Sequence, residues 1–243
     1  MAYDYLGLVN DVCGRVNETP LTSANFANAV GFYSTAKEAV NSAIRDMNQQ
    51  AFQWPFNHTD YDETLVAGQS RYAYQADTKA VDFDTFRIRR NDTFNNSTTH
   101  LKFMDYDEYV ERFIDAEYDS TNESIREVPK YVFRAPNQEY GVYPVPKEAY
   151  TLSYEYYALP TDLSANTDVP SAPVAFRHVV VDGAMYYVYH FRGDTETADR
   201  LQAKFINGIE RMRTIYINNN YDYVRDTRVG QRSPYGSNTL RLT

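Results

Sequence analysis

The pattern of hydrophobic and polar positions begins with helical spacing near the N-terminus. Within residues 4–17, the apolar side chains Leu6, Val9 and Val16 recur at steps that place them on one helix face. Pro20 follows and cannot continue a helix. This pattern predicts a short amphipathic helix over residues 4–17.

A longer helical pattern comes next. From Phe26 to Ala51, apolar residues are spaced by three, four or seven positions, and Thr22 and Ser23 precede them as N-cap candidates. The pattern predicts one amphipathic helix of about seven turns. It ends before Trp54-Pro55, because proline disfavours helix in the residue before it.

The middle of the chain changes to the two-residue period of strands. Tyr150, Leu152, Tyr154 and Tyr156 alternate with polar residues, which predicts a half-buried strand. Shorter alternating runs predict further strands, one of them interrupted near Thr85, and a single helical pattern lies between them. The expected strands cover 71–75, 81–88, 131–134 and 140–143, and the expected helix covers 106–118.

The pattern returns to helix over residues 173–218. Pro173 suits a first helical turn, and Arg192-Gly193 interrupts the apolar stripe. Asp194 is placed to cap a second helix. These features predict two consecutive helices and an α+β fold. Its expected parts are 1–55 (helical), 56–171 (β-rich with one helix), 172–218 (helical) and 219–243 (a tail).

Charge and composition narrow the class of protein. Lys and Arg number 24 against 33 Asp and Glu, a formal charge of −9. A protein that grips nucleic acid with its whole surface needs a basic face, so that class is disfavoured. No apolar run approaches the ~20 residues of a membrane span, and Met1–Asn10 is not a signal peptide. With one cysteine, no intrachain disulfide can form, and we expect a soluble protein of a reducing compartment.

Motifs that carry chemistry are missing from the sequence. No HExxH, CxxC, GxGxxG, Walker or GxSxG spacing occurs. His178 and His190 are twelve residues apart, which turns them about 120° from each other on a helix. Cys13 belongs to an apolar helix stripe and is expected to be a buried hydrophobic residue. We therefore expect no catalytic residue, no metal site and no cofactor.

The last 25 residues differ from the rest of the chain. Four arginines stand against two aspartates over residues 219–243, so this tail is mildly basic while the chain as a whole is acidic. Such a terminus is either disordered or bound along a neighbouring protein. Its candidate partner-binding residues are Tyr223, Arg225, Arg228, Arg232, Tyr235 and Arg241.

Three segments in a fixed order resemble a known family. They are Ile44-Arg-Asp-Met-Asn-Gln-Gln-Ala-Phe-Gln-Trp-Pro-Phe56, then Leu152-Ser-Tyr-Glu-Tyr-Tyr-Ala-Leu-Pro-Thr-Asp-Leu163 after Tyr143-Pro-Val-Pro146, and finally Phe176-Arg-His-Val-Val-Val-Asp-Gly-Ala-Met185 after Asp168-Val-Pro. Together they resemble the head-to-tail adaptor proteins of tailed bacteriophages, also called tail tubular protein A or head-completion adaptors. The similarity covers most of residues 5–217.

The resemblance implies a non-enzymatic structural protein of the virion, assembled in the host cytoplasm. It implies a helical bundle formed by both ends of the chain, an inserted β-rich domain and an extended C-terminal tail that docks on the portal protein. Twelve copies would form a ring between the portal and the tail nozzle or tail tube. Genomic DNA would pass through this ring without sequence-specific binding, and no membrane is involved.

Two other functions fit the residues. A peptidoglycan hydrolase of the muramidase type would need two carboxyl groups across a cleft, and Glu155, on a strand among tyrosines, is the first candidate. A glycan-binding tail module could use exposed tyrosines on strands to stack on sugars, although the long terminal helices do not suit it.

Overall fold

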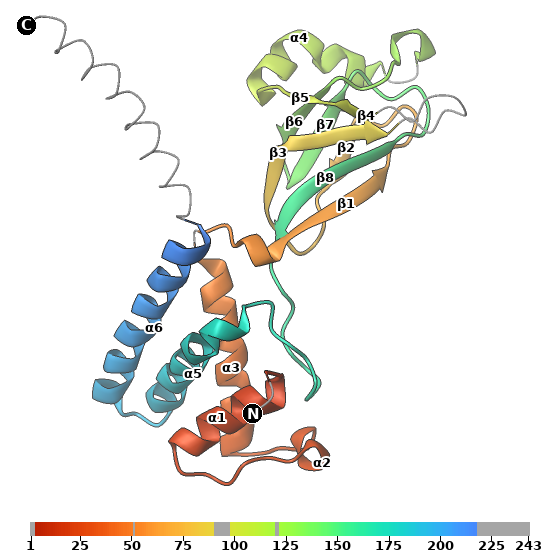
Figure 1. Ribbon diagram of the computed structural model, residues 1–243. Coiled ribbons are helices and arrows are strands. Elements are labelled where there is room, and N and C mark those ends of the chain that lie inside the picture. Colours follow the sequence, from red (N-terminus) through yellow and green to blue (C-terminus); the bar gives the residue numbers. More distant parts are fainter. Residues whose placement is uncertain (1–2, 51, 90–97, 120–121, 218–243) are drawn as a thin grey trace, which may run out of the picture. The chain divides into compact units, whose positions relative to one another are not determined.

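The computed structural model describes residues 3–50, 52–89, 98–119 and 122–217. The chain divides into two compact units (Figure 1). The helical unit takes the described residues of 1–56 and 160–243, and the sheet unit takes those of 57–159. Both sheets lie in one unit together with helix α4 (Tyr106–Tyr118), and the other α-helices lie in the helical unit, which confirms the α+β class.

The first part of the helical unit holds α1 (Tyr5–Arg15), α2 (Ser23–Phe26) and α3 (Phe32–Gln49). The prediction of one continuous helix over this region is wrong, because the chain leaves the helix after Phe26 and starts again at Phe32. Gly31, the N-cap of α3, has φ +63°, a conformation that glycine adopts without steric cost. Val30, assigned to the apolar stripe, is 77% exposed.

The second part of the helical unit follows the sequence closely. A short η3 (Val174–Phe176) leads into α5 (Arg177–Phe191), and α6 (Thr195–Tyr216) follows. Gly193 turns the chain between them with φ +80°. Asp194 caps α6, because its side chain accepts a hydrogen bond of 3.1 Å from the Thr197 N–H. The predicted break and cap are confirmed.

Helix α5 is the centre of the helical unit and packs on α1, α3 and α6. Close approach occurs at Gly183, where an added Cβ would lie 2.7 Å from the ring of Phe205 on α6 and 2.9 Å from Ala43 Cβ on α3. The surrounding core is mostly aliphatic, since such close helices leave little room for rings. It includes Leu8, Val9, Val12, Val40, Ala43, Ile44, Val180, Val181, Ala184 and Val188.

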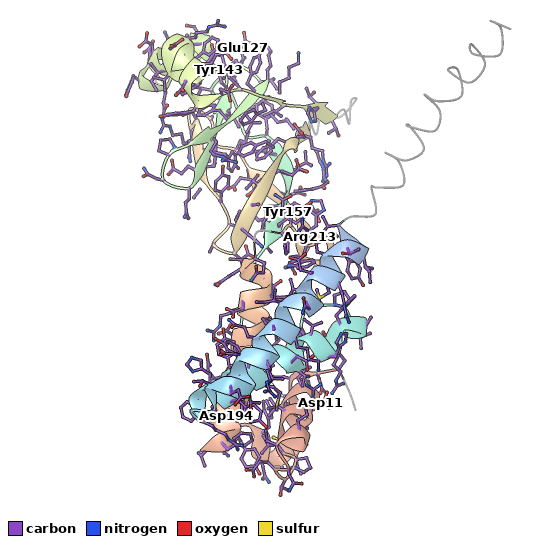
Figure 2. All side chains as sticks on the ribbon, turned by 90° about the vertical axis from the view of Figure 1, so that its left-hand side faces the viewer. Asp11, Glu127, Tyr143, Tyr157, Asp194 and Arg213 are labelled. Atoms are coloured by element: carbon purple, nitrogen blue, oxygen red, sulfur yellow. The ribbon has the colours of Figure 1, made fainter. Side chains whose placement is uncertain are left out.

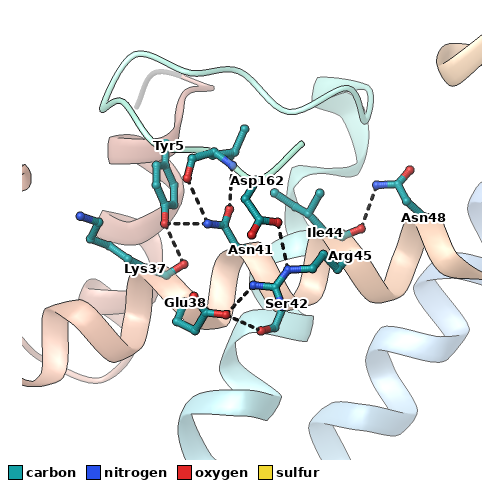
Figure 3. A network of polar contacts seen from close by, with 10 residues as sticks. Tyr5, Lys37, Glu38, Asn41, Ser42, Ile44, Arg45, Asn48 and Asp162 are labelled. Carbon is teal, nitrogen blue, oxygen red and sulfur yellow. Dashed lines mark hydrogen bonds and ion pairs between the residues drawn. The ribbon is translucent and has the colours of Figure 1, made fainter. Parts of the chain in front are cut away.

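Polar contacts join the two chain segments of the helical unit. The Tyr3 hydroxyl donates to the Ala172 carbonyl (2.6 Å), and the Arg177 guanidinium forms an ion pair with Asp11 and donates to the Gly7 carbonyl (2.9 Å). Asn41, buried on α3, donates to the Leu163 carbonyl and accepts from the Leu163 N–H (Figure 3). These bonds connect segments more than 100 residues apart in the sequence.

The Asn41 bonds also hold the chain after Leu159 in the helical unit rather than in the sheet unit. The β-rich part was expected to extend to residue 171, whereas the sheet unit ends at Leu159. Leu163 is fixed to α3 by Asn41, and Ala172 is buried in the core of the helical unit. Residues 160–171 form no helix, so their membership of the helical unit was not visible in the periodicity.

The sheet unit contains two four-stranded sheets with the orders β1-β8-β3-β4 and β2-β7-β6-β5. Neighbouring strands are antiparallel, except for the parallel pair β5 and β6. At Leu101 the chain passes from one sheet to the other, because the Leu101 N–H donates to Phe86 O and the next N–H to Lys130 O. The strands are β1 (His58–Thr64), β2 (Arg71–Ala73), β3 (Thr78–Arg89), β4 (Thr98–His100), β5 (Lys102–Phe103), β6 (Tyr131–Ala135), β7 (Glu139–Tyr143) and β8 (Thr151–Ala158).

Most elements of the sheet unit match the sequence pattern. Helix α4 (Tyr106–Tyr118) is confirmed, and the short 3₁₀ segments η1 (Pro55–Asn57) and η2 (Glu123–Ile125) flank other elements. The expected interruption near Thr85 is a register shift in β3, where the Thr85 hydroxyl accepts from the Glu155 N–H (2.9 Å). Strand β1 was missed, because its polar sequence at a sheet edge carries no apolar alternation.

Aromatic rings fill the space between the two sheets. Phe86 stacks on Tyr154 at 4.7 Å between ring centroids, and Tyr140 meets both rings edge-on. A second cluster under α4 places Phe133 against Tyr109 at 3.8 Å. Sheets that face each other lie roughly 10 Å apart, a gap that large rings fill well. Many of the chain's tyrosines therefore serve this core.

Candidate interaction surfaces

Glu155 is the residue expected to carry any hydrolytic chemistry. It lies on β8 opposite Asp60 of β1 and Asp82 of β3. Its carboxylate forms ion pairs with His58 and Arg87, each at 3.4 Å. A strand carboxylate held by an arginine and a histidine is typical of polar side-chain networks on a sheet surface.

Metal-ligand geometry is likewise not found in the described residues, where no group of three or more His, Cys, Asp or Glu side chains could hold a metal ion. Cys13 is fully buried in the core around α1, as the apolar stripe predicted. None of the described helices has the length and apolar character needed to cross a bilayer.

A shallow groove lies along α3 and α5 at the surface of the helical unit. Its volume is about 330 Å³, and it is lined by Ser34, Thr35, Glu38, Ala39, Ser42, Tyr187 and Phe191. Phe191, the last residue of α5, is 75% exposed there. Small residues on α3 beside two rings on α5 make a surface suited to an apolar side chain from another protein.

One carboxylate lines this groove, and two more lie behind it through Tyr187 and Arg45. Glu38 lines it and pairs with Arg45 on the next turns of α3, and Arg45 also pairs with Asp162 at 2.9 Å (Figure 3). The Tyr187 hydroxyl donates to Asp46, and burial together with this carboxylate raises the pKa of Tyr187. Glu38 and Asp162 share the Arg45 guanidinium, and Asp46 adds a third carboxylate beside Tyr187. We call this surface the acidic groove.

Helix α6 presents a surface of opposite charge, which we call the basic flank: Arg200, Lys204, Arg211 and Ile215. Lys204 donates to Asp182 (3.0 Å), a carboxylate on α5 that is 2% exposed and also pairs with Arg15 of α1. Arg200 pairs with Glu196 one turn earlier. Within the described part of the chain, no carboxylate lies within ion-pair distance of Arg211, and Ile215 is 51% exposed.

The basic flank and the acidic groove lie on different sides of the helical unit. Lys204 and Arg213 are nine residues apart, so they point to opposite sides of α6 at about 100° per residue. On one side, Lys204 contacts Asp182, which also pairs with Arg15 of α1. On the other side, the Arg213 guanidinium lies 4.6 Å from the ring centroid of Phe52, just after the end of α3. Figure 2 looks onto α6, with Arg213 and Asp11 of α1 labelled.

The predicted partner-binding residues are all in the tail. Tyr223, Arg225, Arg228, Arg232, Tyr235 and Arg241, and residues 219–243 as a whole, lie outside the described residues. Sequence reasoning placed the basic surface only there and missed the basic flank. The available signal was the spacing of Arg200, Lys204 and Arg211 along one side of the predicted second C-terminal helix.

Comparison with known proteins gives one positive result. The model of a family described as SU10 adaptor protein matches residues 3–232. This match includes the described parts of both the helical unit and the sheet unit. A search of the curated proteins finds no match.

Proposed function

The chain belongs to the SU10 adaptor protein family, a family of phage head–tail adaptors, and we propose that it forms a ring between the portal and the tail of a virion. The observation that carries this proposal is the extent of the family match, which takes in both units rather than one shared domain. The role is structural. Copies of the chain hold the portal above and the tail nozzle or tail tube below.

A ring of identical subunits needs two different, complementary surfaces on each copy. The acidic groove and the basic flank are two such surfaces, and they lie on different sides of the helical unit. We propose twelve copies in the ring. Genomic DNA passes through its lumen without sequence-specific contacts, in keeping with a formal charge of −9 for each chain.

We propose that the tail, residues 219–243, binds the portal protein. Its four arginines would meet carboxylates or backbone carbonyls of the portal, and Tyr223 and Tyr235 would add apolar contact. A single tail loses conformational entropy on binding, and a ring that presents many tails offsets this cost through multivalency.

The proposal is tested by mixing the purified chain with its cognate portal protein and measuring mass by mass photometry, followed by electron microscopy. We expect a ring bound to one end of the portal. A chain lacking residues 219–243 should keep its fold and lose portal binding. If the full-length chain stays monomeric and free in the presence of the portal, the proposed function is wrong.

A further inference from the structure

We propose that neighbouring copies of this chain contact each other head to tail, with the basic flank of one copy placed in the acidic groove of the next. The inference rests on the proposed ring and adds the two surfaces that would close it. The partner is a second copy of the same chain.

Charge complementarity is the first argument. At the acidic groove, Glu38 and Asp162 pair with Arg45, and Asp46 accepts from the groove-lining Tyr187; Arg192, next to Phe191, is already paired with Glu18. The basic flank has Arg200, Lys204 and Arg211, and Arg15 of α1 adjoins it through Asp182; the carboxylates in this network are Asp182 and Glu196. Each surface thus carries an excess of one sign, and contact between unlike surfaces is favoured over contact between like ones.

The apolar side chains at the two surfaces give the second argument. Ile215 stands exposed one helical turn beyond Arg211, and Phe191 stands exposed at the groove beside Tyr187. A contact that seats Ile215 against these rings removes apolar surface from water on both copies. Arg211, which has no ion-pair partner within the described residues, would then lie at the rim facing Glu38.

The position of the two surfaces gives the third argument. They lie on different sides of α6 and its neighbours, so the contact is heterologous: one copy offers its groove and also its flank. A heterologous contact is repeated at the next copy and closes into a ring when the rotation allows. A symmetric dimer would instead need one surface to fit itself, which equal charges oppose.

A charge-reversal cycle tests the contact. Glu38→Arg and Arg211→Glu should each weaken assembly of the full chain by about tenfold, because each places like charges together. The double variant carries both reversals on every copy, so it should recover most of the lost association. Glu148→Arg, at an exposed position of the sheet unit, is the matched control and should assemble like the wild type.

Cysteine cross-linking tests the same contact by position. The native Cys13 is buried, so cysteines introduced by Ser42→Cys and Arg211→Cys are the accessible thiols. A mixture of these two variants, assembled on the portal and treated with a short bismaleimide, should give a covalent dimer. Each variant alone, or Ser42→Cys mixed with Glu148→Cys, should not.

The outcomes separate this inference from the proposed function. Rings that form normally but show neither cross-link nor charge rescue would overturn the contact and leave the ring intact. Failure of the wild-type chain to assemble with or without the portal would overturn both. Thermal unfolding of every variant checks that a loss of assembly is not a loss of fold.

Discussion

The two units of this protein solve the same packing problem with different side chains. In the helical unit, alanine, valine and glycine let α5 lie close to three other helices. In the sheet unit, half of the main core cluster is aromatic: Tyr72, Phe86, Tyr140, Tyr150, Tyr154 and Tyr156. Closely packed helices favour small residues, whereas facing sheets leave a gap that rings fill. The helical unit is small-residue-rich around α1, α3 and α5, whereas its second cluster holds Trp54, Phe176 and Phe205.

The stabilities of the two units should differ most at alkaline pH. Burial raises the pKa of Tyr72 to about 12 in the sheet unit and of Tyr3 to about 12 in the helical unit. A tyrosine whose pKa is higher in the folded state stabilises fully below its unfolded pKa of about 10, and this contribution is lost as the pH rises toward the folded pKa. Among the described residues, the sheet unit has more tyrosines with raised pKa: Tyr72, Tyr74, Tyr109, Tyr140, Tyr154, Tyr156 and Tyr157, against Tyr3, Tyr5 and Tyr187 in the helical unit.

We therefore expect the sheet unit to unfold first as the pH rises from 9 through the range of about 10 to 12. Near-UV circular dichroism follows the tyrosine core, and the 222 nm signal follows the helices. Tyrosinate absorbance should rise together with the near-UV loss. Loss of the helical signal before the near-UV signal would contradict the comparison.

Two glycine-to-alanine substitutions give the next largest effect. At Gly141 on β7, the added Cβ would lie 2.1 Å from Cζ of Phe133, whose ring is held against Tyr109. At Gly183 on α5, the closest atoms are 2.7 Å and 2.9 Å away, on Phe205 and Ala43. We expect Gly141→Ala to destabilise by about 3 kcal/mol and Gly183→Ala by about 2 kcal/mol.

Urea unfolding of both glycine variants measures these losses. Gly14→Ala is the control, since an added Cβ there meets no atom within 4 Å. Equal stability of Gly141→Ala and the wild type would show that the ring of Phe133 can move, and that the aromatic core is not tightly packed.

The smallest of the three effects is expected at Asn41, whose side chain links α3 to the backbone of Leu163. Asn41→Leu removes the two bonds to the Leu163 backbone and leaves the N–H and carbonyl of Leu163 without them. We expect a loss of about 1–2 kcal/mol in the free energy of unfolding, because unpaired backbone groups near the core are costly. Faster proteolysis at residues 160–171 should accompany it.

The matched control for Asn41→Leu is Ser42→Ala. Ser42 is the next residue on α3, and its hydroxyl makes only a 3.5 Å contact with Glu38 at the surface. This variant should stay within about 0.5 kcal/mol of the wild type. If Asn41→Leu does the same, residues 160–171 are held by packing rather than by these bonds.

Periodicity alone was sufficient for the elements with a continuous apolar stripe. Helix α4, the break at Gly193 with its Asp194 cap, and the β3 irregularity near Thr85 were all correctly predicted from local pattern. The break between α2 and α3 was not, because the apolar spacing continues across Gly31 although the chain leaves the helix there. Strand β1 was missed because its sequence has no alternating apolar positions. Its pairing with β8 holds it in the sheet, and local pattern does not show that pairing.

The sequence by itself determined the α+β class, the buried state of Cys13 and the order of segments that resembles the phage adaptors. These depend on local spacing and residue type, which the chain carries at every position. Only the tertiary structure decided that Leu163 joins α3 through Asn41, and that Glu38 and Arg211 belong to surfaces of opposite charge. Such features arise when distant segments pack together, and no local period encodes which segments will meet.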